Sequence, residues 1–338
     1  GSVDYFDIEN ERNFNVATAK RQPGSAFKPF AYAMAFQKGY PDFTVLFDAK
    51  TEFSPNCTPE AEQEKDEYGL ECYHPRNYDG RFRGPVTMRQ ALSQSLNVPS
   101  VKTLYLAGVN DTIDLAEKMG ITTLGDRSRF GLSLVLGGAE VKLTDITSAY
   151  GVFANDGIRN PWYFVKSIES ADGTVLENNS PDPERVVDPQ TARLVSDVLS
   201  DNSARAPVFG YSSSLYFPGR SVAAKTGTTQ ENRDAWVIGY SPTVATGIWV
   251  GNNRQESMTQ EGAGISAAGP MWHEFMTKAL EKLSREEFVK PDLVSSSKPM
   301  LNGNYDSSDP HSVLYYVDRG SDQFENWEWS VRRFFGLN

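Results

Sequence analysis

The stretch that decides the fold reads Arg21-Gln22-Pro23-Gly24-Ser25-Ala26-Phe27-Lys28-Pro29-Phe30. The Pro-Gly pair marks a turn, and the apolar run that follows ends at Gly39, a residue type common at helix C-termini. Within this run the apolar residues recur at helical spacing. They are Phe27, Phe30, Ala31 and Met34. We therefore predict a buried helix over residues 25–38 whose first turn carries Ser25.

Ser25 and Lys28 are three residues apart, so in a helix they lie on one face and the amine can reach the hydroxyl. A serine hydroxyl becomes a good nucleophile when a nearby base removes its proton. Lysine can be that base if burial or a second cation keeps it neutral. The pattern is weak by itself, because Ser295-Ser296-Ser297-Lys298 repeats it in a polar stretch without helical periodicity.

Composition limits the classes of function. The chain has 338 residues, 39% of them hydrophobic, which is enough for a large core or two domains. Its formal charge of −11 argues against nucleic acid or an anionic membrane as the main partner. The sequence has no apolar run of the length that a transmembrane helix needs and no visible signal peptide. We expect no membrane span within it.

The two cysteines, Cys57 and Cys72, flank an acidic loop. A local disulfide fits this spacing and would indicate an oxidising compartment, while two unrelated thiols remain the alternative. The histidines have no metal-ligand spacing with one another, with cysteine or with carboxylates. They are His74, His273 and His311. We predict no metal and no cofactor, and a Ser-Lys scheme is easier to place than a Ser-His-Asp scheme.

Periodicity and turn residues predict an α+β fold, an antiparallel β-sheet flanked by helices. Helices are expected from Thr87, from Pro99, from Asn110 to Gly120, and over residues 145–155, 189–199 and 270–283. Strands are expected at residues 3–8, 14–18, 163–168, 175–176, 221–228, 235–240 and 243–250. Residues 40–85 are expected to be irregular. Residues 1–285 form the main domain, residues 286–312 read as a polar linker, and residues 313–338 form an aromatic C-terminal segment of unknown role.

Ser25 belongs to the first of three short motifs that occur along the chain. Ser25-Ala26-Phe27-Lys28, Ser95-Leu96-Asn97 and Lys225-Thr226-Gly227 follow one another, 70 and then 130 residues apart. The first opens a helix, the second falls on a turn between helices, and the third lies on a strand before a hairpin. Ser200-Asp201-Asn202 competes for the second place, but it ends a helix only 23 residues before Lys225. We favour Ser95 and Asn97 because of the longer spacing and the helix-turn-helix setting.

With these motifs the chain resembles the transpeptidase domain of a class A (bifunctional) penicillin-binding protein. The resemblance covers roughly residues 1–285. It extends through residues 21–30, 77–87, 94–99, 224–229, 234–236 and 249–252. It implies a serine β-lactamase/D,D-transpeptidase-like fold, peptidoglycan stem peptides and β-lactams as partners, and an extracytoplasmic location. The membrane anchor and glycosyltransferase domain of that family are not found in this sequence, so we expect a fragment held to the membrane only through a missing N-terminal anchor.

The resemblance also implies a role for each motif residue. Ser25 would attack the D-Ala-D-Ala carbonyl, Lys28 would be its base, and Ser95 would pass the proton to the leaving amine. Asn97 would hydrogen-bond Lys28 and the substrate amide. Lys225, Thr226 and Thr228 would hold the terminal carboxylate, and the backbone N–H groups of Ser25 and Thr228 would form the oxyanion hole. For Gly227 we expect that the missing side chain lets the substrate backbone lie against the strand.

Two other classes stay open: a β-lactamase or D,D-carboxypeptidase on the same fold, and a non-catalytic penicillin-binding sensor domain. In class A β-lactamases a glutamate in a Glu-x-x-Leu-Asn segment between the second and third motifs activates the deacylating water. No glutamate in residues 98–224 is followed by Leu and Asn at that spacing, and Glu140 comes nearest. We therefore expect the acyl-enzyme to persist until an amine acceptor arrives.

Overall fold

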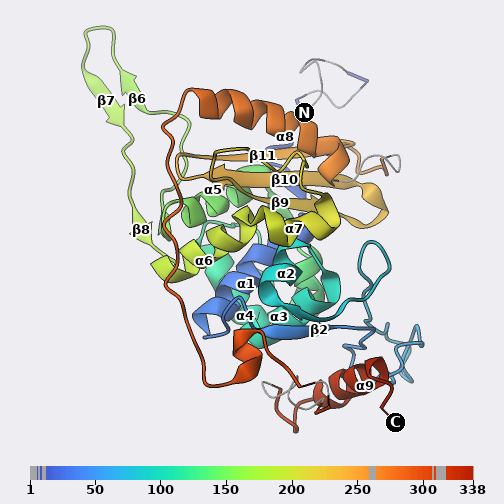
Figure 1. Ribbon diagram of the computed structural model, residues 1–338. Helices are drawn as coiled ribbons and strands as arrows, with labels where there is room; N and C mark the ends of the chain where they lie inside the picture. Colours follow the sequence, from blue (N-terminus) through green and yellow to red (C-terminus); the bar gives the residue numbers. More distant parts are fainter. Residues whose placement is uncertain are drawn as a thin grey trace.

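The computed structural model describes residues 6, 8–9, 13–258, 264–306, 308–309 and 317–337. A three-stranded antiparallel sheet in the order β11–β10–β9 runs through its upper half (Figure 1). β9 spans Ala223–Thr228, β10 Asp234–Ser241 and β11 Val244–Gly251. Trp236 on the central strand pairs with Gly227 on one side and Trp249 on the other. β9 is therefore an edge strand, with one side open to the helical part of the molecule.

The two faces of the sheet are covered by different helices. α8 (Gly264–Glu281) packs Trp272 and Met276 against Val237 on one face. Trp236, Ile238 and Tyr240 alternate with Val237 and point to the other face, where they join the main core with α5 (Leu143–Ala154). Figure 1 shows α8 above the sheet and α5 below it. Burial on both faces explains why β10 reads as a continuous apolar run.

α1 (Lys28–Gln37) is the centre of the helical layer, with nearly every side chain buried. A single 3₁₀ turn, η1 (Gly24–Phe27), leads into it. The surrounding helices are α2 (Met88–Ser93), α3 (Asn97–Ala107), α4 (Val109–Lys118), α6 (Pro189–Ser200) and α7 (Asn202–Phe209). Short 3₁₀ turns are η2 (Arg127–Arg129), η3 (Leu132–Leu136), η4 (Gln230–Asn232) and η6 (Pro299–Asn302).

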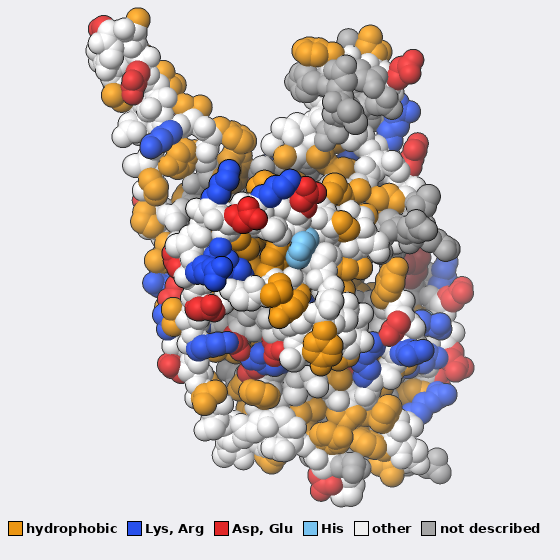
Figure 2. All heavy atoms as spheres, turned by 45° about the horizontal axis from the view of Figure 1, so that its top comes forward, with side chains coloured by type: hydrophobic (Ala, Val, Ile, Leu, Met, Phe, Trp, Pro, Cys, Tyr) orange, Lys and Arg blue, Asp and Glu red, His pale blue; other side chains and the backbone are white. Residues whose placement is uncertain are grey.

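The remaining strands among the described residues form four two-stranded ribbons. β1 (Lys20–Arg21) pairs with β4 (Val141–Lys142), β2 (Val45–Asp48) with β3 (Gly84–Thr87), β5 (Ile158–Arg159) with β8 (Glu184–Arg185), and β6 (Ser167–Glu169) with β7 (Val175–Asn178). The β6–β7 hairpin projects away from the body (Figure 1), and hydrophobic side chains lie along it (Figure 2). Cys57 and Cys72 are joined by a disulfide in the irregular segment between β2 and β3.

Several element boundaries differ from expectation. Residues 14–18 form turns rather than a strand, and the strand expected at 163–168 begins only at Ser167. The strand expected at residues 3–8 lies mostly outside the described residues. α3 begins at Asn97 rather than Pro99, because a proline in the first helical turn loses no hydrogen bond. α8 begins at Gly264, before Pro270, because its first turns already pack on the sheet.

The last helix, α9 (Phe324–Phe334), lies beside β2 at the bottom of Figure 1 and belongs to the main core. Trp327 and Val331 are fully buried there. In the segment expected to be a linker, Phe288 packs on the ring of Tyr240 and Met300 is buried. The described parts of both segments therefore contact the body, while the domain division at residues 285 and 312 stays a prediction. Of the described helices, none is long and apolar enough to cross a membrane.

Candidate active site

Ser25 lies on η1, which packs directly against the edge strand β9. Gly24 has a φ of +53°, and a Cβ on it would lie 2.4 Å from the carbonyl oxygen of Thr228. A Cβ on Gly227 would lie 2.2 Å from the carbonyl oxygen of Pro23. Gly227 is therefore needed for contact between the strand and the Ser25 turn, a reason other than the substrate contact expected from the sequence. These glycines place the half-buried Ser25 beside Thr228.

Ser95 lies at the turn between α2 and α3 in a strained backbone conformation. Its N–H donates to the carbonyl of Leu92 (3.1 Å), and that of Leu96 donates to Ala91 (2.9 Å), which closes α2 in the Schellman pattern. The residue at this position needs a positive φ, and Ser95 has a φ of 60° where glycine is usual. The strain holds the Ser95 hydroxyl at the end of α2, where both motif lysines reach it.

This geometry predicts a difference between two Ser95 variants that both lack the hydroxyl. We expect Ser95→Gly to be more stable than Ser95→Ala by about 1 kcal/mol, because only alanine keeps the strain of a positive φ. Both variants should acylate equally slowly with a β-lactam. Chemical denaturation and acylation rates measure the two effects. Equal unfolding free energies would contradict the strain argument, and a fast Ser95→Gly enzyme would contradict a role for the hydroxyl.

The Lys28 amine is fully buried and surrounded by acceptors from the second motif. Its Nζ donates to the carbonyls of Ser95 (2.7 Å) and Leu96 (3.1 Å) and to Oδ1 of Asn97 (2.8 Å). Burial lowers the pKa of Lys28 well below its ordinary value, and the nearby charge of Lys225 lowers it further. This is the direction that a lysine base requires.

Lys225 approaches the same centre from β9. Its Nζ donates to Oγ of Ser95 (2.7 Å) and to the carbonyl of Thr226 (3.0 Å). Burial lowers the pKa of Lys225 to about 7, with a further contribution from the positive charge of Arg205 on α7. Both motif lysines therefore meet at the Ser95 hydroxyl. Lys28 and Lys225 are separate in sequence but share one low-dielectric environment, where each disfavours the charge of the other.

Asn97 and Thr228 are held from outside the three motifs. Nδ2 of Asn97 donates to the carbonyl of Arg76 (2.7 Å), which leaves its Oδ1 facing Lys28. Oγ1 of Thr228 accepts the N–H of Gly264 (3.0 Å) at the start of α8. Six polar residues, five from the three motifs and the neighbouring Thr228, thus lie in one region built by η1, the start of α1, the α2–α3 turn and β9. They are Ser25, Lys28, Ser95, Asn97, Lys225 and Thr228.

The competing sequence patterns have structural roles instead. Asp201 accepts the N–H of Ala204 at the start of α7 and pairs with Arg89 (3.0 Å). The Ser200 hydroxyl donates to the carbonyl of Asp197 (3.2 Å), so this triplet is a helix junction. Around Ser295 the chain is irregular, and Lys298 precedes the short turn η6 rather than a buried helix.

His74, His273 and the two cysteines lie outside this cluster. His74 pairs with the buried carboxylate of Glu52 (2.8 Å), and Nδ1 of His273 lies 2.9 Å from the carbonyl of Ser214. His311 lies outside the described residues. Glu52 is near the sulfurs of Cys57 and Cys72, but these sulfurs are bonded to each other and offer no thiolate to a metal.

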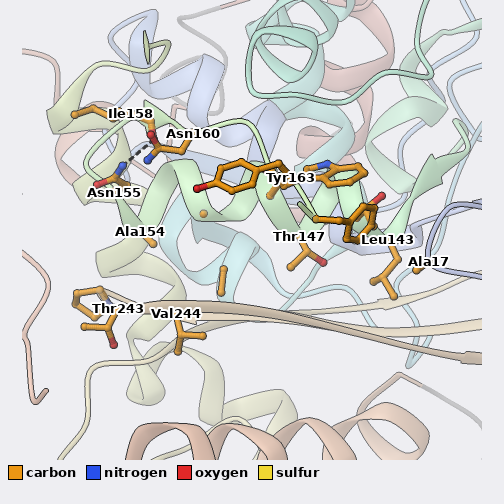
Figure 3. Close-up of a pocket in the computed structure, with 17 residues that line it drawn as sticks. Ala17, Leu143, Thr147, Ala154, Asn155, Ile158, Asn160, Tyr163, Thr243 and Val244 are labelled. Atoms are coloured by element: carbon orange, nitrogen blue, oxygen red, sulfur yellow. Dashed lines mark hydrogen bonds between the residues drawn. The ribbon is translucent and has the colours of Figure 1, made fainter. Parts of the chain in front are cut away.

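A groove on another part of the molecule contains none of the candidate residues (Figure 3). It has a volume of about 620 Å³ and lies between α5, the β10–β11 turn and the segment that carries Trp162, Tyr163 and Phe164. In Figure 3, Thr147 and Leu143 of α5 border it above Thr243 of the turn and Val244 at the start of β11. The three motifs instead meet on the side of the sheet where β9 faces η1.

Sequence motifs missed four residues that contact or influence the site. Arg205 supplies a buried positive charge next to Lys225, and Tyr150 donates to the carbonyl of Ala26 (2.7 Å) within the Ser25 turn. Asn77 accepts the N–H of Asn97 (2.7 Å), and Asp48 holds Asn77 in turn. Asn77 belongs to a stretch that carries the family resemblance, and this membership could have marked it as a residue of the site. The other three have no local pattern that marks them.

The fold and the three converging motifs are those expected of an acyl-transferring enzyme. A family model described as penicillin-binding protein transpeptidase domain matches residues 5–277. The chain therefore belongs to the penicillin-binding protein transpeptidase family, which confirms the resemblance and the fold class deduced from the sequence.

Relatives of known name support the same placement. The chain is 33% identical over 307 residues to penicillin-binding protein 1A of Neisseria lactamica, and 35% identical over 284 residues to that of Aquifex aeolicus. These matches cover 88% and 82% of the chain but 36% of each relative. The chain thus spans about a third of the length of these relatives.

Among solved structures, PonA1 of Mycobacterium tuberculosis in complex with penicillin V matches with a TM-score of 0.69 and 29% identity. That match covers 83% of this chain and 75% of the other. Penicillin-binding protein 1A of Haemophilus influenzae has the same fold, with a TM-score of 0.71 and 24% identity over 86% of this chain and 47% of that one.

Proposed function

We propose that this chain is a peptidoglycan D,D-transpeptidase that works through an acyl-Ser25 intermediate and is acylated by β-lactams at the same residue. The observation that carries the proposal is the meeting of Lys28 and Lys225 at the Ser95 hydroxyl, with Lys28 three residues after Ser25. Family membership supports the reaction class. The relative solved with penicillin V supports the inhibitor class.

In the proposed acylation step, neutral Lys28 takes the Ser25 proton while Ser25 Oγ attacks the carbonyl between the two terminal D-alanines. The tetrahedral oxyanion is held by backbone N–H groups of Ser25 and Thr228, whose segments lie in contact. Ser95 donates its proton to the departing D-alanine nitrogen as the C–N bond breaks. Ser95 is reprotonated through the lysines, and an amine acceptor later attacks the ester by the reverse sequence.

Electrostatics support recognition of a carboxylate-terminated peptide. The chain has a net charge of −11, yet two buried side chains that can carry a positive charge lie beside neutral Lys28: Lys225 and Arg205. Such a cluster attracts an anion into a site that the overall charge would repel. A substrate carboxylate bound by Lys225, Thr226 and Thr228 would in turn favour the charged form of Lys225. That charge keeps Lys28 neutral.

We also propose an extracytoplasmic location, where stem peptides occur. The Cys57–Cys72 disulfide supports it, because such bonds persist in oxidising compartments. Attachment to the membrane would come from chain outside the present sequence.

The test of the proposal is the site of covalent labelling. Treatment with a fluorescent penicillin, digestion and mass spectrometry should find the adduct on Ser25. Ser25→Ala should lose the label completely, because the ester has no other oxygen in place. Ser200→Ala and Ser295→Ala should label like wild type, since both patterns lie in structural segments. An adduct on any other residue would overturn the assignment.

A second prediction separates a transpeptidase from a β-lactamase. The penicilloyl-enzyme should last many minutes and nitrocefin turnover should be negligible, because no glutamate matches the deacylating segment of class A β-lactamases. With a thioester acyl donor, a D-amino acid should speed release of the acyl group. Intact-mass time courses measure the first effect and product analysis the second. Multiple-turnover nitrocefin hydrolysis that disappears in Ser25→Ala would favour the β-lactamase alternative.

A further inference from the structure

The first N–H of α3 is satisfied from a remote loop rather than by a cap of its own. The N-cap residue of α3, Leu96, has no side chain that could accept a hydrogen bond. Instead, Oδ1 of Asn77 accepts the N–H of Asn97 at 2.7 Å. Asn77 is almost completely buried. It thus fixes the position at which α3 begins, and that position presents Asn97 Oδ1 to Lys28.

The amide of Asn77 is itself locked by a buried carboxylate. Its Nδ2 lies 2.9 and 2.8 Å from the two oxygens of Asp48 and 2.7 Å from the carbonyl of Arg81. Carbonyl and carboxylate oxygens accept hydrogen bonds, so the amide nitrogen must face them. The amide oxygen then has one orientation, toward Asn97. Asp48 removes the freedom to flip that an isolated asparagine would have.

Asp48 lies at the end of β2 and is completely buried. It also accepts the backbone N–H of Arg83 (3.0 Å), and the Arg83 guanidinium lies 3.9 Å away. The buried amine of Lys102 donates to the neighbouring carbonyl of Phe47 (2.8 Å). A carboxylate without such partners would be costly in this environment. Asp48 is therefore held on several sides.

We propose that Asn77 is a positioning residue for the acylation step, oriented by Asp48 and acting through the start of α3 on Asn97 and Lys28. The inference rests on the proposed function of this site. Asn77 does not contact the reacting atoms in this arrangement. It sets the place of the groups that do, and a misplacement of about 1 Å costs about 100-fold in rate.

The experiment replaces Asn77 and Asp48 one at a time and then exchanges the two side chains in a double variant. Asn77→Asp places a second carboxylate against Asp48 and removes the amide donors. Asp48→Asn removes the charge. In the double variant Asp48→Asn/Asn77→Asp, the new carboxylate at position 77 can accept both the N–H of Asn97 and the new amide at position 48. The double variant thus keeps the hydrogen bond to α3, with the amide now at position 48 and the carboxylate at position 77, while the carbonyl of Arg81 loses its donor.

The readouts are the first-order acylation rate constant and the noncovalent dissociation constant of a β-lactam, at a temperature where circular dichroism shows each variant folded. We expect Asn77→Asp to slow acylation about 10- to 100-fold with little change in the dissociation constant. The double variant should acylate much faster than Asn77→Asp and approach the wild-type rate constant, because the hydrogen bond that positions α3 is restored. Asp79→Asn is the matched control, because Asp79 pairs with Arg83 on the exposed side of the same loop (2.7 Å).

Two outcomes overturn this inference: a folded Asn77→Asp enzyme with the wild-type acylation rate constant, or a double variant as slow as the single one. If Asn77→Asp does not fold, the double variant still decides, since it must fold and acylate nearly as wild type does. Failure of the proposed function is separate. It would show as a wild-type adduct on a residue other than Ser25, whereas failure here leaves the adduct on Ser25.

Discussion

Replacing Lys28 by methionine is expected to slow acylation by a β-lactam about 10³-fold, within the range that a general base contributes. The side chain keeps a similar length and stays buried, but the only amine donating to Ser95, Leu96 and Asn97 together among the described residues is removed. Ser25 then keeps its proton. Stopped-flow acylation with a chromogenic β-lactam measures the loss.

The matched control is Lys298→Met, which alters the second Ser-x-x-Lys pattern and should acylate at the wild-type rate. The free energy of unfolding should change by at most about 2 kcal/mol in Lys28→Met, because three acceptors lose a donor while the cost of burying an amine disappears. A folded Lys28→Met enzyme that acylates within a few fold of wild type would show that another group is the base.

The same pair of lysines determines the pH dependence of the wild-type enzyme. A lysine is neutral above its pKa and charged below it. Acylation by a carboxylate-bearing substrate should rise with pH as Lys28, with its strongly lowered pKa, loses its proton. It should fall as free Lys225 loses its proton around pH 7. The ratio kcat/KM should therefore follow a bell-shaped curve.

The second large effect concerns stability. Trp327→Ala is expected to lower the free energy of unfolding by about 3–5 kcal/mol, as for other buried Trp-to-Ala changes. The indole is fully buried. Its ring lies 6.1 Å from that of Phe53 and 5.4 Å from that of Tyr105, and the Lys102 amine lies 5.1 Å from it. Removal leaves a cavity against the buried amine of Lys102. Urea denaturation followed by circular dichroism measures the loss.

Trp329→Ala is the control for this prediction, because Trp329 lies on the same helix but is only partly buried. We expect a change of about 1 kcal/mol or less at that position. If both variants unfold at the same denaturant concentration as wild type, α9 does not belong to the cooperative unit that contains α1.

The parts of the site that could be predicted from sequence are those with a local pattern. Ser25 and Lys28 lie one helical turn apart, and Ser95 and Asn97 are framed by helix signals. The contacts that hold Asn97 in place are not local. Asn77 accepts the N–H of Asn97, and Asp48, which orients Asn77, lies 29 residues before it in a segment without periodicity. Its function depends on tertiary burial, which no spacing reveals. The start of α8 and the burial of α9 likewise depend on contacts with distant elements.

The β6–β7 hairpin gives the molecule a place that tolerates added material. Every residue of both strands is exposed, and its base is closed by the β5–β8 pair. Its tip at Asp172 and Gly173 stands away from the body (Figure 1). Exposed hairpin tips accept inserted sequence readily. A fluorophore or affinity tag inserted between these two residues would report on the enzyme in cells without touching Ser25 or the core.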